Sequence, residues 1–383
     1  MRLITTTAEL EQVCGRLRAE PYVTVDTEFQ RDRTYWPKLC LLQLAGKTDA
    51  VAVDPLAPGL DLAPALALMD DPAVVKVFHA ARQDAEIFWR LTGRAPQPLF
   101  DTQIAAMVCG FGEEVGYETL VNKMAKAQLD KSSRFTDWSK RPLSDAQLHY
   151  AISDVTHLRV IYEKLRARIE KAGRLAWVEA EMQALCDPEL FEQPPEESWR
   201  RLKIRSRDPR FLAVVQALAA WRERAAQSRD LPRNRVLRDD ILLEVAAHKP
   251  GSLDELRGHE RVNLDRESAR QVVTAIEEAL ARPADELPRL PPPSVAPRGL
   301  GPLMDLLRVL LKLRCEEAEV AQRLVATSSD LEAIALDDEA DVPALKGWRR
   351  AIFGEQALAL KQGRLALTVE KRKPVVIELE EEG

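Results

Sequence analysis

Two carboxylates, Asp26 and Glu28, lie one residue apart in the apolar run 23–29. The run is rich in β-branched residues and predicts a strand, in which alternate side chains share one face. The two acids would then project together and repel each other unless water or a divalent cation neutralises them. A solvated strand and a metal site both fit this pair, and two later acids favour the metal site.

The two later acids are Asp84 and Asp154. Asp84 follows a predicted strand at 74–79 and falls in the first turn of the next predicted helix, where the helix dipole favours negative charge. Asp154 lies four residues after Tyr150 on a helix predicted over 144–172, so these two side chains share one helix face. Each motif is commonplace alone, and only their order and spacing are specific.

This order, Asp-x-Glu on a first strand, Asp after a later strand and Tyr-x-x-x-Asp on a later helix, resembles the DEDDy exonucleases and, within them, the ribonuclease D family. The resemblance implies an α/β fold, a ribonuclease H-like DEDD exonuclease domain with a central mixed sheet. Further matching motifs are Asp26-Thr27-Glu28-Phe29, Arg33-Thr34-Tyr35-Trp36-Pro37, Leu42-Gln43-Leu44, His79-Ala80, Pro98-Leu99-Phe100-Asp101-Thr102-Gln103, Asp137-Trp138 with Arg141-Pro142-Leu143, and Tyr150-Ala151-Ile152-Ser153-Asp154.

The resemblance implies a 3′→5′ exoribonuclease that hydrolyses phosphodiester bonds and releases nucleoside 5′-monophosphates. By the same resemblance Asp26, Glu28, Asp84 and Asp154 hold two divalent metal ions, and Tyr150 orients the attacking water. Carboxylate oxygens suit Mg²⁺ or Mn²⁺, and two such ions roughly 4 Å apart serve the attacking and leaving oxygens. Whether Tyr150 also acts as a base stays open, since an unperturbed phenol has a pKa of about 10.

Several neighbouring residues are candidates for contacts with RNA. Aromatic rings can stack on bases without sequence preference, and a basic loop that also contains Arg134 and Lys140 could contact phosphates. The alternatives are core packing for the aromatic residues, an ordinary strand-end role for His79 and a solvated loop for the basic residues. The candidate substrate-binding residues are Phe29, Tyr35, Trp36, Gln43, His79, Lys131 and Arg141.

The chain divides into an α/β part followed by helical modules. The modules resemble HRDC domains, small helical bundles of helicases and ribonuclease D, at Leu218-Ala219-Ala220-Trp221-Arg222, Arg229-Asp230-Leu231-Pro232 and Asp239-Asp240-Ile241-Leu242. The expected divisions are an exonuclease domain at 1–190, a linker at 191–208, an all-α HRDC domain at 209–282, a Pro-rich linker at 283–299, a degenerate all-α HRDC-like domain at 300–370 and a frayed charged tail at 371–383. The strands expected in the first domain lie near 22–29, 39–45, 50–53 and 74–79, and the helices near 7–18, 61–70, 82–92, 101–110, 117–126 and 144–172.

Composition indicates a multidomain protein of the cytoplasm. The chain has 383 residues, 46% of them hydrophobic, which is enough for two or three cores. Its five cysteines lack Cys-x-x-Cys spacing, its start is not typical of a signal peptide, and no apolar run approaches the roughly 20 residues that span a bilayer. The net charge of −6 conceals a basic stretch at 200–210.

The expected partners are RNAs, in particular tRNA precursors and other small structured RNAs with single-stranded 3′ ends. Linked helical modules would hold such RNAs near the active site and raise their effective concentration there. Two alternatives remain open at this point: a DNA 3′→5′ exonuclease and a non-catalytic RNA-binding scaffold. The sequence has no phosphate-binding Gly-x-x-x-x-Gly-Lys loop, which a helicase-associated DNA exonuclease would be expected to carry. The oligomeric state is not indicated.

Overall fold

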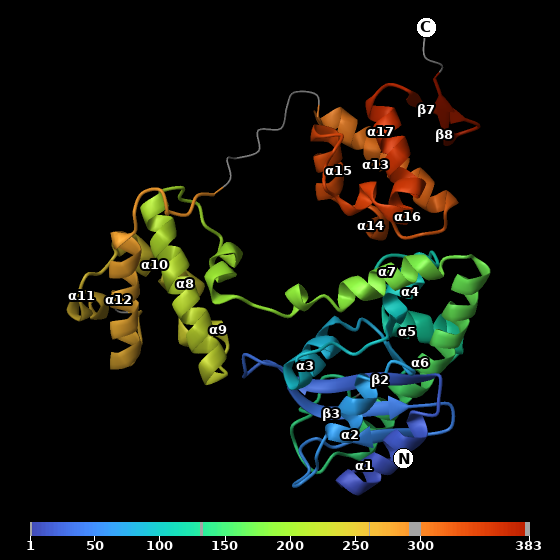
Figure 1. Cartoon of the computed structure of the whole chain (residues 1–383), viewed down its shortest axis with the longest axis horizontal. Coiled ribbons are helices and arrows are strands. Elements are labelled where there is room, and N and C mark those ends of the chain that lie inside the picture. The colour runs from blue at the N-terminus through green and yellow to red at the C-terminus, as the bar shows by residue number, and fades with distance from the viewer. Residues whose placement is uncertain (1, 131–132, 260, 291–299, 380–383) are drawn as a thin grey trace.

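The computed structural model describes residues 2–130, 133–259, 261–290 and 300–379, which form an N-terminal domain and two helical bundles (Figure 1). The N-terminal domain (residues 2–190) is built around one six-stranded sheet with the strand order β1-β4-β3-β2-β5-β6. Its strands are β1 (Arg2–Ile4), β2 (Tyr22–Gln30), β3 (Lys38–Ala45), β4 (Ala50–Val53), β5 (Val75–Phe78) and β6 (Leu99–Asp101).

The sheet is mixed, as the sequence predicted. Strand β3 runs antiparallel to both β2 and β4, whereas β2, β5 and β6 run parallel to one another. Two short strands, β1 and β6, were not expected, because three-residue segments carry too little periodicity to be recognised. Strand β2 pairs with β5 through Tyr22–Thr24 and with β3 over most of its length, and the pairing with β3 includes both of its acids.

Helices cover the sheet and supply the rest of the core. The long helix α6 crosses the sheet, contacting strands β2 to β5. Helix α7 was not expected, whereas the six expected helices are all present. The helices of this domain are α1 (Thr7–Leu17), α2 (Ala63–Met69), α3 (Arg82–Thr92), α4 (Thr102–Val108), α5 (Tyr117–Leu120) continued by a π-helical turn (Val121–Ala125), α6 (Asp145–Lys171) and α7 (Leu175–Leu185), followed by a 3₁₀ turn (Pro188–Leu190).

The first bundle (residues 195–290) begins earlier than predicted. Trp199 and Leu202 are buried in its core, so much of the expected linker at 191–208 belongs to the bundle. This segment is amphipathic and includes a 3₁₀ helix (Pro195–Arg201) that packs on α8. The other elements of the bundle are α8 (Pro209–Arg229), α9 (Arg233–Val236), α10 (Asp239–His248), α11 (Leu253–Arg257) and α12 (Arg266–Ala281).

The second bundle (residues 300–379) ends in a β-hairpin, which corrects the expectation of an all-α module with a frayed tail. Leu367 and Val376 of the two strands pack against the bundle core, because alternate residues of this charged segment are apolar. Residues 291–299 of the expected Pro-rich linker and 380–383 of the tail lie outside the described residues. The elements are α13 (Leu300–Glu317), α14 (Gln322–Val325), α15 (Ser328–Leu336), a 3₁₀ turn (Pro343–Leu345), α16 (Gly347–Arg349), a π-helical turn (Arg350–Gly354), α17 (Glu355–Lys361), β7 (Leu365–Glu370) and β8 (Lys373–Glu378).

The second bundle contacts the N-terminal domain around α4 and α7. The Trp177 and Trp348 rings stack with centroids 4.6 Å apart. Arg174 donates hydrogen bonds to the carbonyl oxygens of Ala318 and Glu319. Gly110, at a φ of +72°, lies so close to Glu319 that a Cβ atom would be 2.7 Å from its carbonyl oxygen. A side chain at position 110 would therefore disrupt this contact.

No helix in the described ranges is long and apolar enough to cross a membrane. All five cysteines are buried and unpaired in the structure.

Candidate active site

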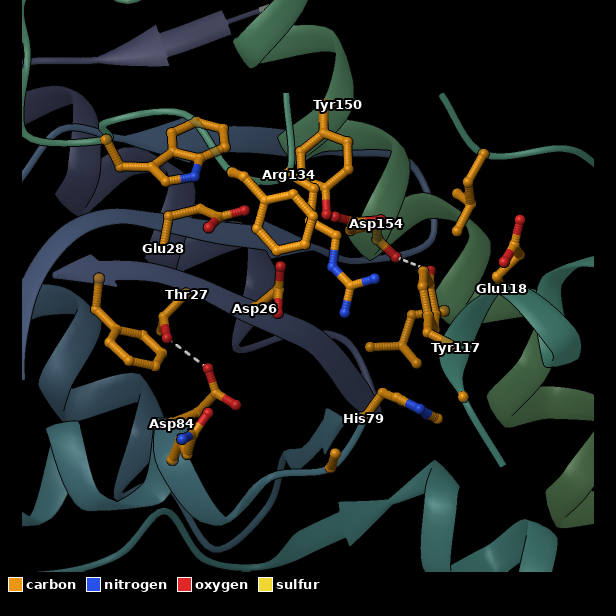
Figure 2. Close-up of a pocket in the computed structure, with 18 of the residues that line it drawn as sticks. Asp26, Thr27, Glu28, His79, Asp84, Tyr117, Glu118, Arg134, Tyr150 and Asp154 are labelled. Atoms are coloured by element: carbon orange, nitrogen blue, oxygen red, sulfur yellow. Dashed lines mark hydrogen bonds between the residues drawn. The ribbon is translucent and has the colours of Figure 1, made fainter. Parts of the chain in front are cut away.

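Three of the predicted metal ligands converge in a pocket of about 720 Å³ in the N-terminal domain (Figure 2). Carboxylate oxygens of Asp26, Glu28 and Asp154 all lie within 4.8 Å of one another. Tyr150 and Asp84 also line this pocket. The structure thus places all five predicted catalytic residues around one cavity, although only three of the acids form the close group.

Strand β2 supplies two of the three converging acids. Asp26 pairs with Gln43 and Glu28 with Leu41 across the β2–β3 ladder, and both acids face α6 as alternate residues of one strand. Immediately after Glu28 the register with β3 shifts by one residue. Such a bulge bends the strand and redirects the side chains beside it. Here it lies where the strand enters the pocket.

Helix α6 supplies Asp154 and Tyr150. Ser144 caps its N-terminus in a reciprocal capping box with Gln147, which fixes where the helix begins. The spacing of four residues then brings Tyr150 and Asp154 onto the face that looks into the pocket. Tyr117 of α5 donates its hydroxyl hydrogen to the carbonyl oxygen of Asp154 and holds this turn of the helix from the other side.

Asp84 lies in the first turn of α3, on the other side of β2. Its carboxylate accepts a hydrogen bond from the hydroxyl of Thr27, whose side chain points away from those of Asp26 and Glu28 (Figure 2). The start of α3 has no cap of its own, and Asp101 from β6 accepts the backbone N–H groups of Ala80 and Ala81 instead. Asp101 therefore fixes the turn that presents Asp84.

The acids of the pocket are electrostatically strained. Burial first, and repulsion among the carboxylates second, raise the pKa values of Glu28, Asp84 and Asp154 well above the ordinary range. Burial also raises the pKa of Asp26. Arg134 acts in the opposite direction on Glu28 and Asp154. Charges so arranged are stabilised when a cation is supplied.

The residues fit hard divalent cations. Within the described ranges, the buried Oδ1 atom of Asp154 has no hydrogen-bond partner. The converging ligands are all carboxylates, the type that Mg²⁺ and Mn²⁺ prefer. His79 lines the pocket, and burial lowers its pKa to about 4, which keeps the imidazole neutral. Its Nδ1 atom lies 3.0 Å from the Thr102 hydroxyl oxygen, so one ring nitrogen is already occupied.

Comparisons with known proteins agree with this geometry. A family profile described as 3′-5′ exonuclease matches residues 1–170, and the HRDC domain profile matches residues 211–263. The chain is 53% identical to ribonuclease D of Gluconacetobacter diazotrophicus over 371 residues, covering 96% of this chain and 94% of that protein. It is 49% identical to ribonuclease D of Nitrobacter hamburgensis over 381 residues, covering 99% and 100% of the two chains.

The chain belongs to the ribonuclease D family. It is also similar to the crystal structure of Escherichia coli RNase D, described as an exoribonuclease involved in structured RNA processing, with a TM-score of 0.81, 33% identity and coverage of 94% of this chain and 98% of that one. The activity is therefore that of a hydrolase, a 3′→5′ exoribonuclease. These matches confirm the resemblance seen in the sequence.

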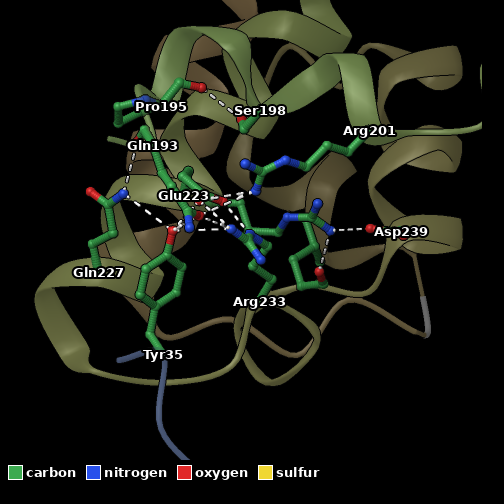
Figure 3. A network of polar contacts seen from close by, with 11 residues as sticks. Tyr35, Gln193, Pro195, Ser198, Arg201, Glu223, Gln227, Arg233 and Asp239 are labelled. Atoms are coloured by element: carbon green, nitrogen blue, oxygen red, sulfur yellow. Dashed lines mark hydrogen bonds and ion pairs between the residues drawn. The ribbon is translucent and has the colours of Figure 1, made fainter. Parts of the chain in front are cut away.

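Two aromatic candidates for RNA contact in this chain, Tyr35 and Trp36, lie elsewhere. Tyr35 is buried against the first bundle, where its hydroxyl contacts Glu223 and its backbone N–H, like that of Trp36, donates to Asp230 over 3.0 Å (Figure 3). The guanidinium carbon of Arg90 lies 3.3 Å from the centre of a Trp36 ring. Both rings have protein partners and neither lines the pocket, so this placement gives their predicted base stacking no support, and it stays a prediction.

Two polar candidates are structural in this fold. Arg141 forms a bidentate salt bridge with Asp54 and also donates to the carbonyl oxygen of Cys40, so it fastens the loop before α6 to the sheet. Gln43 is fully buried opposite Asp26 on the β2–β3 ladder and is not among the residues that line the pocket. The Arg141 guanidinium is therefore committed to acceptors within the protein, and the Gln43 side chain is enclosed. Lys131 lies outside the described residues, whereas Phe29 and His79 do line the pocket.

Sequence reasoning missed or undervalued three side chains of the pocket: Phe135, Arg134 and Tyr117. Phe135 lines it, although 91% of its surface is exposed, and the Arg134 guanidinium carbon lies 5.3 Å from the centre of its ring. Arg134 was noted only as part of a basic loop, yet it faces the acids (Figure 2). Tyr117 was missed as well. The exposed aromatic residue beside an arginine, just before Asp137 and Trp138, was the signal available for the first two.

Proposed function

We propose that Asp26, Glu28 and Asp154, together with Asp84, hold two divalent cations, Mg²⁺ or Mn²⁺. The observation that carries this proposal is the convergence of three carboxylates, half-buried at Asp26 and Glu28 and buried at Asp154, whose pKa values are all raised. When bound, such a pair of cations supplies water activation and stabilisation of the leaving oxygen. Asp84 takes part by rotating its carboxylate away from Thr27, which requires only a side-chain torsion.

We further propose that Tyr150 orients the attacking water through its hydroxyl group. Burial first, and the carboxylates of Asp154 and Glu28 second, raise the pKa of Tyr150 above that of a free phenol. A phenol in this environment keeps its proton, so Tyr150 can both donate and accept a hydrogen bond. This supports orientation of water by Tyr150 over proton removal.

Arg134 and Phe135 form the proposed entrance for RNA. With cations on the carboxylates, the Arg134 guanidinium is released to meet a phosphate of the substrate, for which arginine is well suited. Phe135 offers an exposed ring on which the 3′-terminal base can stack. Phe29, in the same pocket, is the other candidate for a base contact. These roles replace those predicted for Tyr35 and Trp36.

The proposed substrates are tRNA precursors and other structured RNAs with single-stranded 3′ ends, cleaved in the cytoplasm to nucleoside 5′-monophosphates. The similar E. coli protein is described as acting in structured RNA processing. The first bundle exposes arginines at positions 205 and 207, just before the N-terminus of α8. These side chains could hold a folded RNA while its 3′ end reaches the pocket.

The proposal is tested with end-labelled substrates and the full chain. A tRNA precursor with a 3′ tail, the same tail as free RNA and the matching DNA are incubated with Mg²⁺, Mn²⁺ or EDTA. We expect stepwise, metal-dependent shortening with release of 5′-monophosphates, and loss of shortening in the Asp26→Asn variant. Arg205→Glu with Arg207→Glu should raise KM for the precursor but not for the free tail. Equal KM values for the precursor would refute the role of the first bundle, and preferential cleavage of DNA would refute the RNA substrate.

A further inference from the structure

A second group of metal-binding side chains lies in the first bundle, in a part of the chain separate from the nuclease pocket. Donor atoms of Glu244, His248 and His259 all lie within 4.8 Å of one another. We infer that these three residues form a binding site for a divalent transition metal, with Zn²⁺ as the best match. None of the three lines the nuclease pocket, so the inference is independent of the function proposed above.

Two separate segments bring the donors together. Glu244 and His248 are four residues apart on α10 and therefore share one helix face. His259 follows the short helix α11 and lies in a turn, in which its N–H donates to the carbonyl oxygen of Leu256 and its own carbonyl oxygen accepts from Val262. These two hydrogen bonds anchor the backbone of His259 itself, and its imidazole lies against Glu244 and His248 of α10.

The histidine rings are arranged as metal ligands commonly are. The Nδ1 atom of His248 lies 2.9 Å from the carbonyl oxygen of Glu244. A carbonyl oxygen can only accept, so Nδ1 carries the hydrogen and Nε2 presents a free lone pair. A hydrogen bond of this kind fixes the tautomer and orientation of metal-binding histidines. The rings of His248 and His259 have centroids 4.7 Å apart.

The two imidazoles and one carboxylate of this site favour a different class of metal from the class that the acidic nuclease pocket favours. Nitrogen ligands favour Zn²⁺, Co²⁺, Ni²⁺ or Cu²⁺ over Mg²⁺. With Zn–N and Zn–O bonds of about 2.0–2.1 Å, tetrahedral donors lie about 3.3 Å apart. Closing the group from 4.8 Å therefore needs movements on the order of 1 Å. Because these side chains are exposed or half-buried, they can make that movement, and water completes the coordination.

One positive charge borders the site and leaves room for the metal. Arg261 lies 3.5 Å from Oε2 of Glu244 and also pairs with Asp240. The other oxygen, Oε1, is the one that faces His259, 3.8 Å from its Nδ1 atom. The metal can therefore use Oε1 while Arg261 keeps Oε2 and Asp240. Once bound, it would join α10 to the segment between α11 and α12 and stabilise the bundle.

The experiment measures Zn²⁺ and Co²⁺ binding by the full chain. Asp26→Asn and Asp154→Asn are introduced together, and excess Mg²⁺ is present, so that the nuclease pocket does not compete. We expect one Zn²⁺ per chain and a Co²⁺ absorption band typical of nitrogen ligation. His248→Ala and His259→Ala should each weaken binding at least tenfold and remove the rise in Tm caused by Zn²⁺. His149→Ala, which changes an exposed imidazole on α6, is the matched control.

Binding of Zn²⁺ with equal affinity by the parent and both variants would overturn the inference. Circular dichroism checks that each variant is folded. His248→Gln and Glu244→Gln keep the size of the side chains, so they separate loss of a ligand from loss of structure. Exonuclease activity is not the readout, and failure of the proposed function would leave this result unaffected.

Discussion

Two acidic sites in this protein, the group of carboxylates in the nuclease pocket and the single buried carboxylate of Glu223, have opposite electrostatic designs. In the nuclease pocket, Asp26, Glu28 and Asp154 face one another, and their pKa values are raised. At the contact with the first bundle, Glu223 is only 1% exposed, yet Arg233 forms a salt bridge with it and the Tyr35 hydroxyl donates to it (Figure 3). Burial acts to raise the pKa of Glu223, but the hydrogen bonds from Arg233 and Tyr35 outweigh it and lower the pKa.

The difference separates a site built for a ligand from a site built for assembly. Glu223 has its counter-charge within the protein, so the interface is complete without a ligand. The pocket lacks such compensation, so folding keeps the acids close at a cost that a bound cation would offset. Five predictions, ordered by the size of the expected effect, test this contrast.

The largest effect is expected from Asp154→Asn. Removing one of the mutually repelling charges also removes a metal ligand, so kcat should fall by about 10³-fold or more, in line with the loss of a principal electrostatic contribution to catalysis. At the same time Tm in EDTA should rise, because the remaining acids repel less. Degradation kinetics and thermal unfolding of the same preparation check both. A variant that loses activity together with Tm would mean that the carboxylate is structural.

Glu223→Gln should have the opposite profile. Breaking a buried ion pair leaves Arg233 without its partner and costs about 3–5 kcal/mol of stability, whereas kcat on a short single-stranded RNA should stay near that of the parent. The free energy of unfolding, measured in urea, gives this loss of stability. Glu196→Gln is the matched control, since its pair with Arg224 is exposed and such pairs contribute about 0–1 kcal/mol.

The same pair predicts a pH dependence. Because the pKa of Glu223 is lowered on folding, its contribution to stability is complete above the unfolded value of about 4.3 and is lost as the pH falls through the folded pKa. As the pH falls below about 5, the free energy of unfolding of the parent should therefore decrease more than that of Glu223→Gln. Parallel curves for the two proteins would contradict the assignment of the charge to Glu223.

The pocket was predictable from the sequence, and the interface was not. Asp26 and Glu28 follow from strand periodicity, and Tyr150 and Asp154 from helix periodicity, because these patterns act over a few residues. Tyr35 contacts Glu223 across 188 residues of chain, and no local pattern records such a pairing. A base-stacking aromatic and an interface aromatic look alike in sequence, which is why Tyr35 was assigned to RNA.

The fold shows the same limit. The main strands and helices followed from periodicity, and the HRDC resemblance of the first bundle was confirmed by the family match. The edge strands β1 and β6 were missed because they are short and pair with distant segments. The hairpin β7–β8 pairs locally, but it was missed because its charged composition masked the alternation of apolar residues. Phe135 was missed for a related reason, since only the folded loop places it at the pocket.

Addition of a divalent cation should affect the nuclease pocket and leave the Glu223 site unchanged. A ligand that binds only the folded state at about 100 times its Kd adds about 2.7 kcal/mol of stability, so Mg²⁺ or Mn²⁺ should raise the Tm of the parent. The rise should vanish in Asp26→Asn, whose pocket has lost a ligand, and persist in Glu223→Gln. If Mg²⁺ raised Tm equally in all three proteins, the cation would be acting elsewhere than on the raised acids.

The smallest effect is expected at the rim of the pocket, where Phe135→Ala removes an exposed ring. It leaves the acids of the pocket and the Glu223 site intact. Stacking of one base on an aromatic residue is worth about 1–3 kcal/mol, so KM for a single-stranded RNA should rise by about 5- to 150-fold. Stability should not change, since the ring is 91% exposed. Phe135→Trp should retain a low KM and Phe135→Leu should not, because only an aromatic face can stack. Equal KM values for the leucine and tryptophan variants would show that Phe135 excludes water or shapes the loop, and the 3′-terminal base would then be assigned to Phe29.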